Sequence, residues 1–145
     1  MTTGNPHPRR QGRVAVLQAL YAHELTGENQ SKVLKDTLER EPYDKKMQLF
    51  ITTLFNATMD HKEWCEVQIQ DRLNNWVFER VAILDRLLLM VAISEIYFMD
   101  DVPPKVSISE AIEIAKQYST EDSSSFINGI LDNVFKSMEA KDKTS

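Results

Sequence analysis

Three arginines near the N-terminus lie close enough together in sequence to bind an anion. Arg9, Arg10 and Arg13 lie close together, and no acidic residue precedes Glu24. A helix that begins at Arg9 would add the positive end of its backbone dipole to these side chains. The segment is therefore a candidate phosphate site, and a solvated basic helix end without a ligand fits the same spacing.

The charge of the whole chain limits what this basic segment could bind. The chain of 145 residues has a formal net charge of −5, so an acidic protein carries one basic end. This balance argues against a protein that coats itself with nucleic acid by bulk electrostatics. It leaves room for a local site that contacts a few phosphates.

Sequence signatures of catalysis, metal binding and cofactor binding are absent. The four glycines are isolated, so no glycine-rich loop can hold a phosphate, and the three histidines are scattered. Cys65 is the single cysteine, which predicts neither a zinc site nor an intramolecular disulfide and favours a reducing, cytoplasmic setting. We expect a protein without a cofactor that is not an enzyme and not membrane-bound. An all-α enzyme whose site converges from distant residues is an alternative.

Residues 81–96, VAILDRLLLMVAISEI, are predicted to form a central buried helix that positions the rest of the chain. The segment contains no proline or glycine, and residues 87–93 are an unbroken apolar run. A helix that is apolar nearly all round must be covered by neighbours on several sides. It is shorter than the roughly 20 apolar residues that span a bilayer.

Helical periodicity covers most of the remaining chain, and strand-type alternation is absent. We expect an all-α fold of about six to seven helices in two packed helical bundles around the central helix. Residues 1–8 are interpreted as a flexible arm, residues 9–140 as one helical domain and residues 141–145 as a frayed tail. The other helices are expected at 9–27, at 31–40, from 44 with a break near 60–62, from 107 to 118, and after 119 or 120.

Three local features carry more specific predictions. Ser107 to Glu110 has the pattern of a capping box that starts a helix. Gly129 lies inside a helical period, which indicates a close helix crossing where no side chain fits. His61 has no second ligand one turn away and is interpreted as a surface histidine.

Three motifs in order resemble the NusB family of bacterial transcription antitermination factors. RRQGRVAVLQALY at residues 9–21 resembles the arginine-rich opening of the family, and WVFERVAILDRLLLMVAISEI at 76–96 resembles its middle segment. DVPPKVSISEAIEIAKQYSTEDSSSFINGILD at 101–132 follows the most specific family pattern. The chain departs from the pattern at Met90, Ser94 and Ser109, and the first of these replaces an arginine that could have contacted RNA.

The resemblance implies an RNA-binding protein that binds the BoxA element of nascent ribosomal RNA transcripts. It also implies a ribosomal protein partner, NusE, and a role in the RNA polymerase antitermination complex. The arginines would contact phosphates, Tyr21 could stack on a base, and Asp122 could accept hydrogen bonds from base amino groups. The residues implied for RNA binding are Arg9, Arg10, Arg13, Tyr21, Asp122 and Phe126, and Asp85 is implied for partner binding.

Other roles and assemblies remain open at the level of sequence. A similar helical domain is attached to ribosomal RNA cytosine methyltransferases, but this chain holds no glycine-rich cofactor loop. A helical module that binds only proteins is a second alternative. A homodimer that hides the arginine-rich surface in the absence of RNA is a further possibility.

Overall fold

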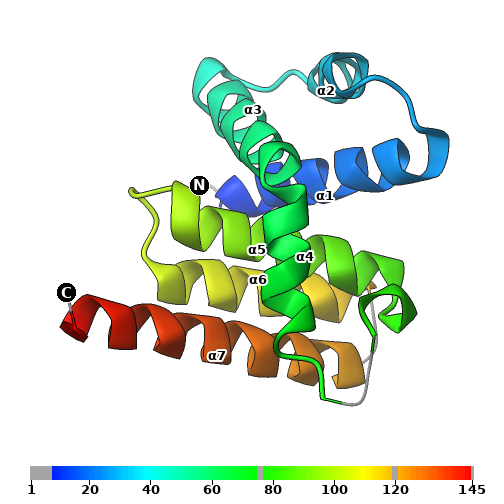
Figure 1. Ribbon diagram of the computed structural model, residues 1–145. Coiled ribbons are helices and arrows are strands. Elements are labelled where there is room, and N and C mark those ends of the chain that lie inside the picture. The colour runs from blue at the N-terminus through cyan, green and yellow to red at the C-terminus, as the bar shows by residue number, and fades with distance from the viewer. Residues whose placement is uncertain (1–7, 75–76, 119–120, 145) are drawn as a thin grey trace.

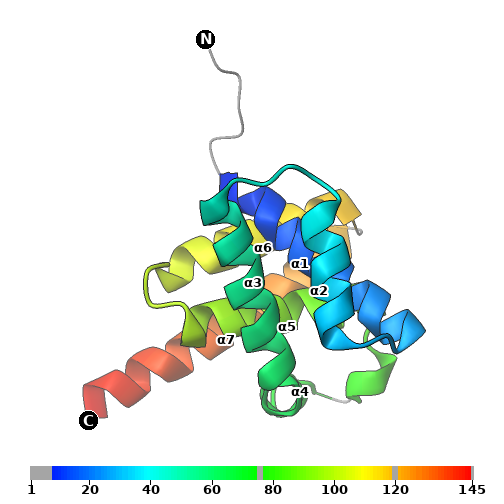
Figure 2. The same ribbon diagram turned by 90° about the horizontal axis from the view of Figure 1, so that it is seen from above.

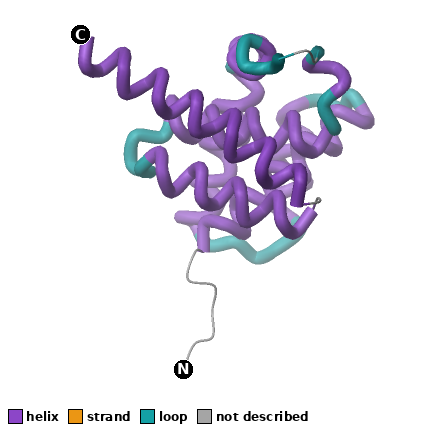
Figure 3. The backbone as a smooth tube through the Cα atoms, turned by 90° about the horizontal axis from the view of Figure 1, so that it is seen from below, coloured by secondary structure: helices purple, strands orange, loops and turns teal. Residues whose placement is uncertain are grey.

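The computed structural model describes residues 8–74, 77–118 and 121–144, except for the side chains of residues 121 and 142–144. Over these ranges the chain is all-α, as the sequence predicts, and Figure 3 shows only helices and connecting loops. The elements are α1 (Pro8–Thr26), α2 (Gln30–Glu39), α3 (Lys45–Asp60), α4 (Lys62–Gln70), the short 3₁₀ helix η1 (Phe78–Arg80), α5 (Ile83–Phe98), α6 (Pro104–Tyr118) and α7 (Glu121–Thr144).

Helix α5 is the centre of the molecule, as its apolar sequence predicts. Residues 87–96 are all buried, because helices cover α5 on every side. Helices α1, α2 and α3 lie on one side of α5, and α6 and α7 lie on the other (Figure 1). Helix α4 packs across α5, and α6 and α7 run side by side in opposite directions. Figure 2 shows that the C-terminal part of α7 extends beyond the other helices.

Local sequence signals set most helix ends. Gly27 has a φ of +68°, the left-handed conformation that commonly ends a helix, and it follows the last residue of α1. The side chain of Asn29 accepts a hydrogen bond from the Ser31 N–H at the start of α2. Asp44 caps α3 in the same way through the Met47 N–H. The predicted break near residues 60–62 is confirmed, since α3 ends at Asp60 and α4 begins at Lys62.

His61, which the sequence predicts to be a surface histidine, is only partly exposed. Its ring stacks on Phe98 with 3.8 Å between ring centroids, and its Nδ1 lies 2.8 Å from the Ala57 carbonyl oxygen. The side chain is half-buried between the α3–α4 junction and the end of α5. The stacking could not be predicted from the spacing of residues near His61, because Phe98 is distant in sequence.

The predicted capping box was also wrong, because α6 begins one turn earlier, at Pro104. Proline suits the first helical position, where its fixed φ is helical and its missing N–H needs no partner. Ser107 and Glu110 therefore lie inside α6, and both are buried. Their side chains are turned toward α1 and α5 instead of capping the backbone.

The close helix approach occurs at Gly12 and not at Gly129. A Cβ atom at Gly12 would lie 2.6 Å from Met47 Sδ and 3.0 Å from the Phe50 ring, so α1 and α3 meet there without room for a side chain. A Cβ at Gly129 would meet nothing within 4 Å, and that residue is exposed. Residues 128 and 129 are helical as predicted, and α7 continues to Thr144, past the expected start of fraying at 141.

None of the helices in the described ranges is long and apolar enough to cross a membrane.

Candidate nucleic-acid interface

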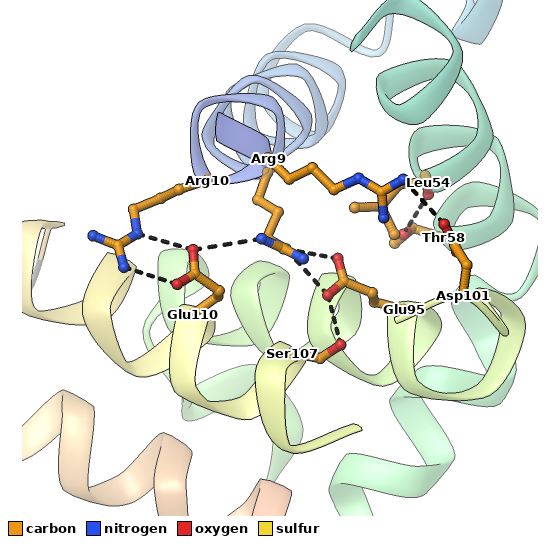
Figure 4. Close-up of polar contacts among 9 residues, drawn as sticks. Arg9, Arg10, Leu54, Thr58, Glu95, Asp101, Ser107 and Glu110 are labelled. Carbon is orange, nitrogen blue, oxygen red and sulfur yellow. Dashed lines mark hydrogen bonds and ion pairs between the residues drawn. The ribbon is translucent and has the colours of Figure 1, made fainter. Parts of the chain in front are cut away.

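The basic end that the sequence predicts is neutralised by carboxylates from α5, from α6 and from the loop between them (Figure 4). Arg9 Nη2 lies 3.0 Å from Asp101 Oδ2, in the loop between α5 and α6. Arg10 donates to both carboxylate oxygens of Glu110 in α6, at 2.9 and 2.8 Å. Each of these two arginines thus has a carboxylate partner, about 90 to 100 residues away in sequence, that periodicity could not assign.

Arg13 is buried and lies between two glutamates. Its Nε donates to the two oxygens of Glu95 at 3.1 and 2.7 Å, and its Nη1 lies 3.4 Å from Glu110 Oε1. The Ser107 hydroxyl donates a further hydrogen bond to Glu95 (Figure 4). In this structure Arg13 joins α1 to α5 and α6 and presents no surface to a large ligand. The implied contact between Arg13 and RNA has no support from its position.

Arg9 and Arg10 differ from Arg13 because both remain accessible. Arg9 is exposed, and its guanidinium carbon lies 4.6 Å from the centroid of the Phe50 ring, a cation–π contact. Arg10 is partly exposed, and its hydrogen bonds to Glu110 raise the pKa of its guanidinium above the ordinary value. Both side chains are held in defined positions by their carboxylate partners.

A second cluster of implied residues lies at the other end of α5. Asp85, Asp122 and Phe126 line one hollow of about 350 Å³ between the start of α5 and the start of α7. Asp85 is buried and accepts a hydrogen bond of 3.0 Å from the Ser123 hydroxyl, whereas Asp122 is exposed and Phe126 is half-buried. Arg80, Val81 and Ala82 complete the lining. The hollow thus combines an aromatic face, two carboxylates and one guanidinium.

The two clusters are separated along α5. Asp85 lies in the first turn of this helix, and Asp101, the partner of Arg9, follows its last turn. A helix of 16 residues spans about 24 Å. Tyr21 belongs to neither cluster: it is exposed in the second half of α1 and is not among the residues that line the hollow. The structure therefore joins Asp85, Asp122 and Phe126, and it leaves Arg9, Arg10 and Tyr21 outside that hollow.

From the sequence we did not assign Glu95, Glu110, Ser107 or Arg80 to either cluster. For Glu95 a cation partner could have been predicted, because a carboxylate inside an otherwise buried apolar helix needs one. The sequence does not indicate which cation this is. Met90, where the family pattern has an arginine, is 2% exposed and packs in the core, so its side chain does not reach the surface.

Known proteins are similar to this chain in both sequence and fold. The NusB family model matches residues 10–136. A NusB transcription antitermination protein from Chloroherpeton thalassium is 42% identical over 134 residues, which cover 92% of this chain and 64% of that protein. A NusB protein from Dehalococcoides mccartyi strain CBDB1 is 41% identical over 130 residues, which cover 90% of this chain and 91% of that protein.

Solved structures agree with these relatives. T. maritima NusB superposes with a TM-score of 0.83 at 38% identity, over 89% of this chain and 91% of that one. A chain from a crystal structure of antitermination factors NusB and NusE with double-stranded RNA has a TM-score of 0.82 over 92% of this chain and 99% of that one. At 22% identity this second match supports the fold alone. The fold and the matched sequence define a helical protein of the antitermination-factor class. The chain belongs to the NusB family.

Proposed function

We propose that this protein is a cytoplasmic, non-catalytic transcription antitermination factor that binds the BoxA element of nascent ribosomal RNA together with NusE. Its relatives at about 40% identity are named transcription antitermination proteins. A protein of the same fold has been crystallised with NusE and RNA. In this proposal the RNA and the ribosomal protein bind as parts of the RNA polymerase antitermination complex.

The hollow at the start of α5 and α7 is the observation that carries the proposal. Phe126 offers a half-buried ring on which an unpaired base can stack. Asp122 is exposed there and can accept hydrogen bonds from a base amino group. Arg80 supplies a positive charge for a phosphate at the same rim. An aromatic face, an acceptor and a cation in one hollow fit a single-stranded RNA better than they fit a duplex.

The test is fluorescence anisotropy of a labelled BoxA-like RNA titrated with the protein, alone and with the ribosomal partner. Phe126→Leu should weaken RNA binding by about 5- to 150-fold, because a base stacked on an aromatic ring contributes roughly 1–3 kcal/mol. Phe135→Leu is the matched control: Phe135 is a half-buried phenylalanine of the same helix, and it lines a different groove. It should leave RNA binding unchanged.

Two outcomes of this experiment would contradict the proposal. Equal binding of BoxA and a scrambled RNA of the same length would show that the hollow does not read the sequence. Equal losses in Phe126→Leu and Phe135→Leu would show that the loss comes from α7 as a whole and not from the hollow.

A module that binds only proteins is the second candidate, and one groove favours it. Ile108, Ile112 and Phe135 form an apolar strip between α6 and α7, bordered by Lys105, Glu113 and Asp132. An apolar centre with a charged rim is typical of a protein interface. Retained binding to NusE, lost in Phe135→Ala, with no response to RNA at any salt concentration would support this candidate.

A further inference from the structure

The buried network around Arg13 is balanced in charge. Arg10 and Arg13 face Glu95 and Glu110, two cations against two carboxylates. Because opposite charges lie within 3.4 Å of one another, the network projects little positive potential toward solvent. A phosphate that binds an arginine here must compete with a carboxylate that already holds it.

Arg10 is the member of this network that a ligand can reach. Its side chain is 21% exposed, compared with 6% for Arg13 and 2% for Glu110. Glu110 takes one N–H from Nε and one from Nη2 of Arg10. A guanidinium has five N–H donors, so a phosphate can first contact the three that Glu110 does not hold and then displace the carboxylate from the other two.

Arg13 lowers the cost of moving Arg10 away from Glu110. A buried carboxylate that loses its only cation is strongly destabilised. Glu110 would keep a cation if Arg10 moved away, because Arg13 Nη1 lies 3.4 Å from Glu110 Oε1. Arg13 is itself held in place by its hydrogen bonds to Glu95. Arg10 can therefore turn toward a ligand while Glu110 keeps a positive neighbour.

Arg9 and Asp101 repeat the arrangement at the surface. Their side chains are 45% and 62% exposed and lie 3.0 Å apart. An exposed ion pair of this kind contributes little to stability and is readily exchanged. Both accessible arginines of α1 are thus held by acidic residues that belong to α6 or to the loop before it.

We propose that Asp101 and Glu110 are internal competitors of RNA. They occupy Arg9 and Arg10 in the free protein, and RNA phosphates take these two arginines from them on binding. The inference rests on the RNA binding proposed above. Neutralisation of α1 would weaken binding to any polyanion, and it would leave the selection of RNA to the hollow that contains Phe126.

Asp101→Asn tests the surface competitor, and Asp36→Asn is its matched control. Asp36 in α2 is also an exposed aspartate in an ion pair, 2.9 Å from Lys32, so both variants remove one negative charge and break one surface pair. Asp101→Asn should bind the BoxA-like RNA several-fold more tightly at low salt. The slope of log K against log salt should steepen by up to about 0.7, the contribution of one phosphate on a single strand. Asp36→Asn should change neither quantity.

Two measurements test Glu110, the buried competitor. One is NMR of the arginine Nε–H groups, and the other is RNA binding by the Glu110→Gln variant. RNA should shift the Arg10 Nε–H signal, which reports the hydrogen bond to Glu110, and leave the Arg13 signal in place. Glu110→Gln should bind RNA more tightly and with a steeper salt slope, whereas a purely structural role predicts weaker binding. Should this variant fail to fold, Asp101→Asn and the NMR signals of the unmodified protein decide the question.

The outcomes separate this inference from the proposed function. Wild-type protein that binds RNA, with Asp101→Asn indistinguishable from it and an unmoved Arg10 signal, would overturn the competitor role and leave RNA binding intact. Wild-type protein that binds no RNA at any salt concentration, with or without NusE, would overturn the proposed function itself.

Discussion

Arg13 donates two hydrogen bonds to Glu95 in the protein interior, whereas Arg9 forms an ion pair with Asp101 on the exposed surface. This difference in burial predicts different energetic roles for two arginines of one cluster. Arg13→Gln should lower the free energy of unfolding by about 3–5 kcal/mol, because it leaves Glu95 buried without its cation. Arg9→Gln should change it by at most about 1 kcal/mol. Urea unfolding of both variants provides the measurement, and equal effects would contradict the assigned roles.

Cys65 supplies a prediction about pH. Burial raises the pKa of its thiol from 9.0 to about 11, while its contact with Ser94 acts in the opposite direction. Below pH 9 the thiol is protonated in the folded and the unfolded chain. Between about pH 9 and 11 only the unfolded chain loses the proton, so the stability of the fold should fall over this range by about 2 kcal/mol.

The control for this prediction is Cys65→Ala, measured by urea unfolding at pH 8.5 and 10.5. Tyrosine and lysine groups titrate in both proteins, so their effects cancel in the comparison. The wild type should lose more stability than the variant between these two pH values. Parallel losses would show that the thiol does not contribute.

At the scale of helices, the approach of α1 to α3 depends on Gly12. Gly12→Leu should destabilise the fold by about 1–3 kcal/mol, because the added side chain meets Met47 and the buried ring of Phe50. Gly129→Ala should stabilise it by up to about 1 kcal/mol, since that glycine lies in a helix with open space around it. Thermal unfolding of the two variants gives the signs, and a stabilising Gly12→Leu would contradict the packing of α1 on α3.

At the scale of the whole molecule, the arginines proposed to contact RNA lie near the two ends of α5. The three arginines of α1, counted from sequence, would give a salt slope of about −2 for single-stranded RNA. Burial removes Arg13 from this count, and Arg80 at the distant hollow adds to it. Each end should therefore make its own contribution to the salt dependence of RNA binding.

Arg80→Ala tests this division of charge. It should flatten the salt slope for a BoxA-like RNA by about 0.7, the contribution of one phosphate on a single strand. Arg40→Ala removes another exposed arginine, at the end of α2, and should leave the slope unchanged. The measurement is anisotropy across a salt series, and equal slopes for Arg80→Ala and the wild type would remove Arg80 from the RNA site.

Sequence reasoning predicted the helices well, because each depends on nearby residues. The apolar run at 87–93, the end of the first helix near residue 27 and the break near residues 60–62 are local features, and the structure confirms all three. The predicted start of α6 was wrong because two local helix-start signals lie close together in this segment. Proline at the first helical position prevailed over a serine cap, and Ser107 became a donor to Glu95.

The candidate site divides in the same way between local pattern and tertiary contact. Residue type, order and spacing are sufficient to predict an all-α fold around one apolar helix, membership in the NusB family and a cluster of arginines on the first helix. The groups that these arginines contact could be found only from the folded chain. Glu95, Asp101 and Glu110 lie more than 80 residues from their partners, and charge neutralisation depends on distance in space. For the same reason, only the fold could show that Asp85, Asp122 and Phe126 share one hollow.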